Sequence, residues 1–342
     1  MPKEITIYDL ARELDLSPAT VSRGLKNHQA INKDTRKRIV EKAEELGYRS
    51  NNFASSLRQQ KSHTIGVLVP QLNSNFIVSV LSGIEKVTAA ANYDIIIAHS
   101  SESGKKEVAN ANNLFHKRVD GLIASLAFDT PNLNHFQQYF KKNIPVVFFD
   151  RVEENSSGAK IIIDNYKAAY EATEHLIDQG CKRIAHLTGN LKRNVYSKRY
   201  QGYRDALQAH NLPFDERLLF MGTLSKEFAV NTAQQIAEIQ PLPDGLFAIN
   251  DLSAALCIQV FKEKGIRVPE DIAVVGFNND TISTISDPQL TTVNYPAIRM
   301  GEQAAMVLMN HLTGSADFSL TNSIVLNSEL IIRQSSLKKK PK

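Results

Sequence analysis

Apolar residues near the start of the chain recur at helical spacing and predict three short helices, over residues 7–14, 18–26 and 33–46. A residue that commonly caps helices stands directly before each of them: Thr6, Ser17 and Asn32. Pro18 strengthens the second start, because proline loses no needed donor at the first helical position. The pattern therefore predicts a small all-α domain at this end of the chain.

The second predicted helix buries one face and exposes the other. Val21 and Leu25 lie four residues apart and form the buried face. The exposed face carries small or hydrogen-bonding side chains: Ala19, Thr20, Ser22, Arg23 and Lys26. Such side chains permit close approach to another molecule, so the three helices indicate a helix-turn-helix.

After residue 62 the pattern changes to apolar, strand-like runs that alternate with longer helical stretches. The predicted strands are 64–69, 94–99, 121–124, 145–150, 183–187, 245–248 and 272–276. The stretches 76–91, 105–118 and 166–179 have helical length and apolar spacing. This alternation predicts an α/β core with two parallel sheets, and ligands of such folds bind at the carboxyl ends of the strands.

Positive charge is concentrated at the start of the chain. Residues 1–62 carry 12 Lys and Arg against 8 Asp and Glu, whereas the other residues carry 28 of each. This asymmetry is expected when one end of a protein binds a polyanion such as DNA, although a solvated basic face is an alternative. Four lysines in residues 335–342 are expected to belong to a disordered, solvated tail.

The composition narrows the class of protein. Cys181 and Cys257 are too few for a disulfide framework or a four-ligand zinc site, and are expected to be buried thiols. No apolar run reaches the roughly 20 residues that span a bilayer, and residues 1–7 open no secretory signal. The sequence thus predicts a cytoplasmic protein without a membrane partner. It holds no recognisable catalytic, metal or cofactor motif, which argues against an enzyme.

The chain resembles the LacI/GalR family of bacterial repressors over essentially its full length. The segments "TIYDLARELDLSPATVSRGLKN" and "TRKRIVEKAEELGY" match the family's DNA-binding signature without gaps. Further segments match family landmarks in order: "TIGVLVP", "KRVDGLIA", "IPVVFFDR", "RYQGYRDAL", "FAINDLSA", "VPEDIAVVGFNN" and "PQLTTV". The resemblance implies a helix-turn-helix domain followed by a periplasmic-binding-protein-like core of two parallel-sheet lobes, joined by three crossovers near residues 163, 290 and 320.

The resemblance also implies where DNA is bound. The second helix enters the major groove, with Pro18, Ala19 and Arg23 toward base edges. Further expected DNA contacts, most of them to phosphates, are Thr6, Tyr8, Ser17, Thr20, Ser22 and Asn27. A guanidinium can bond a guanine edge twice, so Arg23 is the best candidate for reading sequence, and a phosphate contact alone is its alternative role. Gly24 departs from the larger aliphatic residue common in the family, which could loosen the helix.

Residues 52–59, "NFASSLRQ", stand where the family has a hinge helix that folds on operator binding. A helix this short is unstable alone in water. Asn52 and Ala54 are expected DNA contacts, and Leu57 matches the residue that wedges open the minor groove. A leucine docked on the core is the alternative role for Leu57. Ser50 replaces the proline of many relatives, so the linker could be more flexible.

These matches divide the chain into a helix-turn-helix domain, a hinge, two discontinuous lobes and a tail. The helix-turn-helix domain is expected over residues 1–49 and the hinge over 50–62. The first lobe is expected over 63–163 with 291–320, the second over 164–290 with 321–335, and the tail over 336–342. By position, the residues expected to line a cleft between the lobes and bind an effector are Phe76, Asp150, Arg151, Arg193, Arg199, Asp251, Asn278 and Asn279.

The effector itself is left open by these residues. Arg199, Asn278 and Phe76 suit a sugar, since they combine hydrogen-bonding groups with an aromatic platform. Asn278 replaces an aspartate of many relatives, however, and Arg151 and Arg193 leave room for a sugar phosphate or sugar acid. A buried salt bridge within its own lobe is the alternative role for Arg199. Residues around Glu107 and Asn110 are expected at the surface.

The sequence therefore predicts a transcription regulator that binds a pseudo-palindromic operator in double-stranded DNA as a homodimer and is controlled by a small molecule. It is expected to repress carbohydrate-related genes. A global regulator of the same family, controlled by a protein co-effector, is one alternative. A sugar-binding receptor without a DNA role is another, and the basic helix-turn-helix disfavours it.

Overall fold

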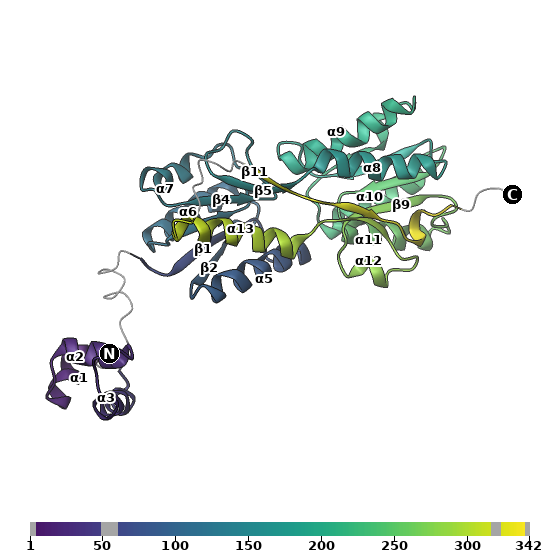
Figure 1. The fold of residues 1–342 in the computed structure, drawn as a ribbon. Helices are drawn as coiled ribbons and strands as arrows, with labels where there is room; N and C mark the ends of the chain where they lie inside the picture. The colour runs from purple at the N-terminus through teal and green to yellow at the C-terminus, as the bar shows by residue number, and fades with distance from the viewer. Residues whose placement is uncertain (1–4, 49–60, 316–322, 339–342) are drawn as a thin grey trace. The chain divides into compact units, whose positions relative to one another are not determined.

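The computed structural model describes residues 5–48, 61–315 and 323–338. The chain divides into two compact units, residues 1–62 and residues 63–342 (Figure 1). The predicted hinge contacts Asn52, Ala54 and Leu57 lie outside the described residues, so their roles stay predictions. No helix of the described part combines the length and the apolar character needed to cross a membrane.

The first unit is built from the helices α1 (Ile7–Leu14), α2 (Pro18–Leu25) and α3 (Lys33–Glu45). Each begins at a side-chain cap, as expected, because Thr6, Ser17 and Asn32 accept bonds from backbone amides of the first turn. Their apolar faces meet in one small core. The predicted helix-turn-helix fold is confirmed.

Gly24 lies at the contact between α2 and α3. A Cβ at this position would overlap the Cδ1 atom of Ile39, a fully buried side chain of α3. The helix continues through Gly24 to Leu25 without a break. The departure from the family pattern thus accompanies close packing of two helices and not an interrupted helix.

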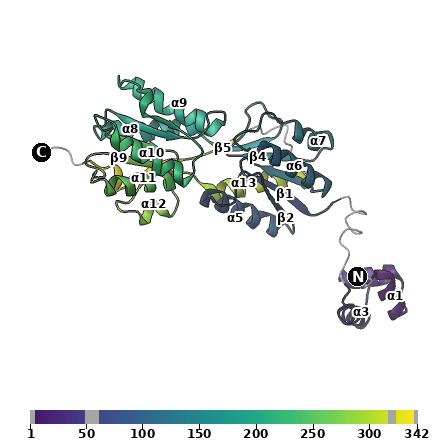
Figure 2. The same cartoon turned by 180° about the vertical axis from the view of Figure 1, so that it is seen from behind.

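The second unit contains two lobes, each with a six-stranded sheet between two layers of helices (Figures 1 and 2). The first sheet is parallel and runs in the order β11-β5-β4-β3-β1-β2. Its strands are β1 (Thr64–Val69), β2 (Asp94–His99), β3 (Gly121–Ala124), β4 (Val146–Phe149), β5 (Ala159–Ile163) and β11 (Ser323–Leu326). Its helices are α5 (Asn75–Ala90) and α13 (Ala297–Leu312) on one face, and α6 (Gly104–His116) and α7 (Gln137–Lys141) on the other.

The second sheet runs in the order β12-β10-β9-β8-β6-β7, and only β12 is antiparallel to its neighbour. Its strands are β6 (Ile184–Thr188), β7 (Leu219–Met221), β8 (Gly245–Ala248), β9 (Ala273–Asn278), β10 (Thr291–Asn294) and β12 (Glu329–Ile331). Helices α8 (Asn165–Asp178) and α9 (Asn194–Ala209) cover one face, α10 (Lys226–Glu238) and α11 (Asp251–Glu263) cover the other, and α12 (Ile282–Ile285) follows β9. The predicted pair of parallel-sheet lobes is confirmed.

The chain crosses between the lobes three times, but two crossovers differ from their expected places. The first follows β5, near residue 163 as expected. The second lies after β10 and not at residue 290, because Thr291–Asn294 pairs with β9 of the second sheet. The third lies between β11 and β12 and not at residue 320, since Ser323–Leu326 pairs with β5. Residues 291–294 and 323–326 therefore belong to the opposite lobes from those expected.

The expected solvated tail is also wrong at its start. Ser335 and Ser336 are fully buried, and the hydroxyl of Ser335 donates to the carbonyl of Val274 at 2.6 Å. Ser336 pairs with a ring nitrogen of His175 at 2.7 Å, and Lys338 donates to the carbonyl of Asp244 at 2.8 Å. Serines whose hydroxyls have partners inside the protein can be buried in a segment without apolar residues. The polar sequence of this segment therefore led to the wrong prediction of an exposed tail.

Candidate DNA-binding helix and ligand cleft

Helix α2 presents its predicted contact face to solvent. Ala19 and Arg23 are exposed and lie one helical turn apart, while Pro18, Thr20 and Ser22 are half-buried beside them. Among the described residues no carboxylate oxygen lies within 4.0 Å of the Arg23 guanidinium. The helix thus exposes one uncompensated cation next to small side chains that do not obstruct it.

The residues around α2 hold its ends in place. The Ser17 hydroxyl accepts from the Thr20 amide at 3.1 Å and pairs with the Thr20 hydroxyl at 2.8 Å, so both side chains stabilise the helix start. Asn27 follows the helix in a left-handed conformation, with φ of 57°. Arg36 donates to the carbonyls of His28 and Ile31 and so ties the following turn to α3.

Helix α1 contributes the two remaining predicted contacts of this unit. The Thr6 hydroxyl donates to a carboxylate oxygen of Asp9 at 2.6 Å, and the Asp9 amide donates back to it at 3.3 Å. Thr6 therefore has a structural role as a helix cap. Tyr8 is 68% exposed, a high value for an aromatic residue, and no packing in the described part of the chain explains it.

A cavity of about 570 Å³ lies between the two lobes of the second unit. Of the predicted effector contacts it is lined by Phe76, Asp150, Arg151, Arg199 and Asn278. It is also lined by residues that the sequence pattern did not single out, among them Asn73, Tyr196, Thr223, Asn250, Asp280 and Tyr295. Side chains from both lobes thus face one space, and a ligand there would touch both.

Arg199 is a buried cation of this cleft. Its Nε donates to Oδ1 of Asn165 at 2.7 Å, and its Nη1 donates to the carbonyl of Ile249 at 3.2 Å. The guanidinium lies 3.5 Å above the ring of Phe277, and burial lowers its pKa. No carboxylate oxygen of the described residues lies within 4.0 Å of it, so the expected alternative of a buried salt bridge does not explain its position.

Asp150 faces the cleft from the first lobe. It follows β4 in a left-handed conformation, with φ of 57°, and accepts a bond from the Tyr295 hydroxyl at 2.8 Å. Burial raises the pKa of Asp150, an effect that the nearby Arg151 opposes. The ring of Tyr295 lies 4.5 Å from that of Phe76, measured between centroids. The cleft therefore combines an acceptor, two aromatic rings and the guanidinium of Arg199.

Arg151 lines the cleft, but its charge is already balanced. Its Nη1 donates to both carboxylate oxygens of Glu102, at 2.9 and 2.7 Å. Its Nη2 donates to the Tyr196 hydroxyl at 2.8 Å, across the boundary between the lobes. The guanidinium also lies 4.3 Å above the ring of Phe128. Arg151 consequently offers an anionic ligand little free charge.

Three predicted cleft residues do not line the cavity. Arg193 reaches from the second lobe into the first, where its Nη2 donates to the carbonyl of Thr130 at 2.8 Å. Asp251 is fully buried and accepts from the Asp280 amide at 2.7 Å, and burial raises its pKa to about 7. Asn279 accepts from Arg333 at 2.9 Å. Each follows a strand end, as expected, but each has internal partners.

Glu107 does not lie at the surface, although its sequence context predicts that position. It is fully buried and accepts from the Ala127 amide at 2.7 Å and the Thr130 hydroxyl at 3.0 Å. A ring nitrogen of His135 lies 2.9 Å from its other oxygen. Glu107 thus holds the loop that follows β3, which is the loop that Arg193 contacts. Its partners lie 20 or more residues away in the sequence, and no local pattern indicates them.

Tyr196 and Tyr295 were missed for an identifiable reason. Tyr295 directly follows β10, a position that strand-end reasoning selects, but the run "TTVN" is not apolar enough to be recognised as a strand. Its buried threonines are satisfied internally, since Thr291 donates to the Arg333 carbonyl and Thr292 to Asp251. Tyr196 lies in the first turn of α9, where only the packing shows that it faces the cleft.

Comparisons with known proteins agree with this architecture. A family model described as "Bacterial regulatory proteins, lacI family" matches residues 6–51, and one described as "Periplasmic binding protein-like domain" matches residues 173–336. Catabolite control protein A of Priestia megaterium is 32% identical over 311 residues, which are 90% of this chain and 92% of that protein.

Two solved structures are similar over nearly the whole chain. A transcriptional regulator CelR–cellobiose complex is 26% identical with a TM-score of 0.71, covering 97% of this chain and 100% of that one. The lac repressor dimer bound to operator and an anti-inducer is 24% identical with a TM-score of 0.85, covering 98% and 100%, and shows the shared fold. These relatives are regulators of transcription and not enzymes. The chain therefore belongs to the LacI family of bacterial regulatory proteins.

Proposed function

We propose that this regulator represses carbohydrate-related genes by binding a pseudo-palindromic operator as a homodimer, and that a sugar in the interlobe cleft controls it. The observation that carries the proposal is the buried Arg199, which lines the cleft without a carboxylate partner among the described residues. Burying a cation is costly, and a polar ligand that accepts its hydrogen bonds offsets that cost.

The chemistry of the lining favours a neutral, hydroxyl-rich ligand. Arg199 and Asp150 place a donor and an acceptor in one cavity, and Phe76 supplies an aromatic surface. Arg151 is balanced by Glu102, and Arg193 lies outside the cavity, so the two arginines that left room for an anion contribute little free charge. The similar CelR structure is a complex with cellobiose, which also supports a sugar.

We further propose that the ligand acts by changing the angle between the lobes. Ligand contacts on both sides of the cleft couple its occupancy to that angle, and a change of angle in the dimer would order or release the hinge segment around Leu57. A coupling of about 1–3 kcal/mol between the two sites would change operator affinity about 5- to 150-fold.

Exposed apolar side chains support the homodimer. In the second lobe they include Met221, Leu252 and Ile285, and in the first lobe Leu72, Val78, Ile97 and Ile298. Figures 1 and 2 show α5, β2 and α12, which carry several of them, along the lower side of both lobes. A face of this kind suits an isologous contact with a second copy of the chain.

A thermal-shift screen against neutral sugars, sugar phosphates and sugar acids tests the proposed ligand class. A ligand that binds only the folded chain stabilises it by about 2.7 kcal/mol at 100 times its dissociation constant. We expect hits among neutral sugars, and we expect Arg199→Met to lose them while Arg204→Met, a variant of another α9 arginine outside the cavity, keeps them. A flat screen with folded protein would contradict the sugar proposal and favour a protein co-effector.

A further inference from the structure

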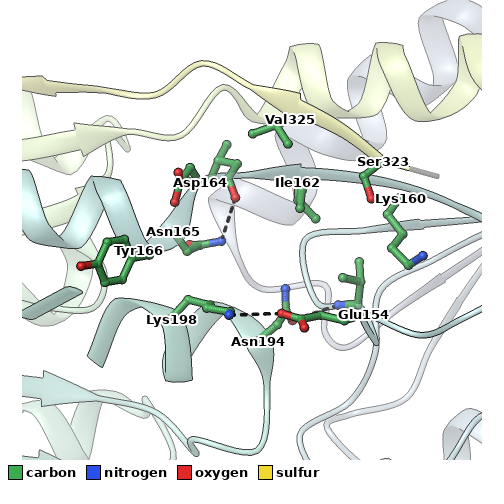
Figure 3. A pocket seen from close by; sticks show the side chains of 12 residues that line it. Glu154, Lys160, Ile162, Asp164, Asn165, Tyr166, Asn194, Lys198, Ser323 and Val325 are labelled. Carbon is green, nitrogen blue, oxygen red and sulfur yellow. Dashed lines mark hydrogen bonds and ion pairs between the residues drawn. The ribbon is translucent and has the colours of Figure 1, made fainter. Parts of the chain in front are cut away.

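A second cavity, of about 380 Å³, lies where the lobes join, and it shares no lining residue with the effector cleft. Figure 3 shows Lys160, Ile162, Ser323 and Val325 on one wall, with Glu154, Asn194 and Lys198 opposite. The first wall is one face of paired strands, since Ser323 lies opposite Lys160 and Val325 opposite Ile162. The facing wall belongs to the first two turns of α9 and the segment after β4.

Lys160 is the notable group of this cavity. The residue is only 5% exposed, and its Nζ donates to the carbonyl of Ser156 at 2.9 Å. No carboxylate oxygen in the described ranges lies within 4.0 Å of that nitrogen, whereas Lys198 pairs with Glu154 at 3.3 Å. Burial lowers the pKa of Lys160. The cavity therefore holds one buried ammonium group whose charge no described side chain balances.

The rest of that strand face is apolar, whereas polar side chains lie both beside Lys160 and across the cavity. Ile162 lies two residues along the same strand face, and Val325 beside it is 58% exposed, which is high for a valine in a sheet. Asn194 and Ser323 supply hydrogen-bonding groups. A ligand that suits this lining carries one negative charge on a short apolar body.

Two asparagines connect this cavity to the effector cleft. Asn165 lines the second cavity, and its Oδ1 accepts from Arg199 of the cleft at 2.7 Å. Asn194 also lines it, and bonds both the Asp150 carbonyl at 3.1 Å and the Val152 amide at 3.0 Å. The first two turns of α9 are thus a shared wall, with Asn194 and Lys198 on one side and Tyr196 and Arg199 on the other.

We propose that this second cavity binds a small organic carboxylate with a short apolar body, recognised by Lys160, and that the bound carboxylate acts on the effector cleft through Asn165 and Arg199. The chain would then respond to two metabolites of different chemistry, one on each side of α9. The site does not depend on the identity of the cleft ligand.

Methyl NMR of the full chain, titrated with sodium benzoate, tests the site. We expect saturable shifts of the Ile162 and Val325 methyl groups, and none with neutral benzamide or with sodium chloride at equal ionic strength. Shifts of equal size with benzamide, no saturation, or shifts confined to Ile77 and Ile249 of the cleft would each overturn the proposal.

Variants separate charge recognition from folding. Lys160→Met keeps the aliphatic stem, and we expect it to weaken benzoate binding about 10- to 100-fold, the effect of losing one hydrogen bond to a charged group. Lys142→Met, at an exposed lysine outside the cavity, is the matched control and should bind as the unaltered chain does. If Lys160→Met proves unstable, Val325→Trp fills the cavity from its exposed side, and retained benzoate shifts at Ile162 would refute the site.

The coupling has its own readout. Arg199 donates to the carbonyl of Ile249, so benzoate bound beside Asn165 should also shift the Ile249 methyl group, by a smaller amount and with the same midpoint as Ile162. Saturation at Ile162 with an unmoved Ile249 would refute the proposed action on the cleft.

Discussion

Several buried polar side chains of this regulator join separate elements by hydrogen bonds, which an apolar residue could not form. Arg199 joins α8, the residue after β8 and the ring of Phe277, and Arg151 joins Glu102 of one lobe to Tyr196 of the other. Each such group is stable only because its partners satisfy it. Single substitutions at these positions therefore report on function and on packing at once, and matched variants are needed to separate the two.

Arg23 gives a prediction at the level of one side chain. We expect Arg23→Ala to relax base preference at one symmetric pair of operator positions, because a bidentate contact to guanine discriminates by about 1–3 kcal/mol. Selection of binding sites from random DNA measures this preference. Lys37→Ala, an exposed cation of α3, should leave the preference unchanged. An unaltered preference in Arg23→Ala would assign Arg23 to a phosphate.

His186 predicts a pH dependence of stability. Its ring is fully buried between Tyr203 and Phe247, and burial lowers its pKa to about 4. Below the unfolded pKa of about 6.5 the unfolded chain binds a proton that the folded chain refuses, so the free energy of unfolding falls as pH falls. From pH 7 to pH 5 the loss from this group should be about 2 kcal/mol.

Urea unfolding at pH 7 and pH 5 measures the change in the free energy of unfolding. His186→Phe provides the comparison, because an aromatic ring at this position keeps the stacking on Tyr203 and Phe247. Between pH 7 and pH 5 we expect the free energy of unfolding to fall by about 2 kcal/mol more in the unaltered chain than in His186→Phe. Other groups such as Asp251 titrate equally in both chains, so their contributions cancel. An equal fall in the free energy of unfolding in both chains would show that His186 does not cause the pH dependence.

At the level of elements, glycines set how closely helices approach. A Cβ at Gly301 of α13 would overlap the Val80 carbonyl, and one at Gly83 of α5 would overlap the Ile298 carbonyl. Gly202 of α9 has the same relation to the Tyr166 carbonyl of α8. Both lobes thus carry one pair of helices in backbone contact.

Gly301→Ala should destabilise the second unit by about 1–3 kcal/mol or more, because backbone atoms cannot move aside as a flexible side chain can. Denaturant unfolding followed by circular dichroism measures the change. Asn310→Ala, on the exposed side of the same helix, should leave stability unchanged or slightly raised. A neutral Gly301→Ala would mean that α5 and α13 can separate without cost.

The elements also show what the sequence could and could not predict. Helix caps at Thr6 and Ser17 and apolar strands such as β8 are local signals, so they placed the helix-turn-helix and most strands. Strand β10 was missed because its threonines find partners far along the chain, at Asp251 and Arg333. Arg193, which contacts Thr130 63 residues away, was placed beside the cleft for the same reason. Hydrogen bonds between polar groups that lie far apart in the chain leave no periodic pattern in the sequence.

At the level of the whole molecule, the exposed apolar side chains lead to a prediction about assembly. Ile285 is 73% exposed, and Ile285→Asp should abolish or strongly weaken the proposed dimer, because a carboxylate would be buried without a partner at the proposed contact. Sedimentation velocity measures the mass. Val108→Asp, at an exposed valine of α6, should stay dimeric. A dimeric Ile285→Asp chain would place the contact elsewhere.

The three crossovers have a consequence for how the protein is made. The first sheet needs β11, and its helix layer needs α13, yet both follow β10 of the second lobe in the chain. A ribosome that has released residues up to Asn294 has therefore exposed neither lobe in finished form, since β12 is also still to come. The helix-turn-helix, by contrast, is complete from the start. A nascent chain could thus hold a folded DNA-binding domain well before the cleft between the lobes exists.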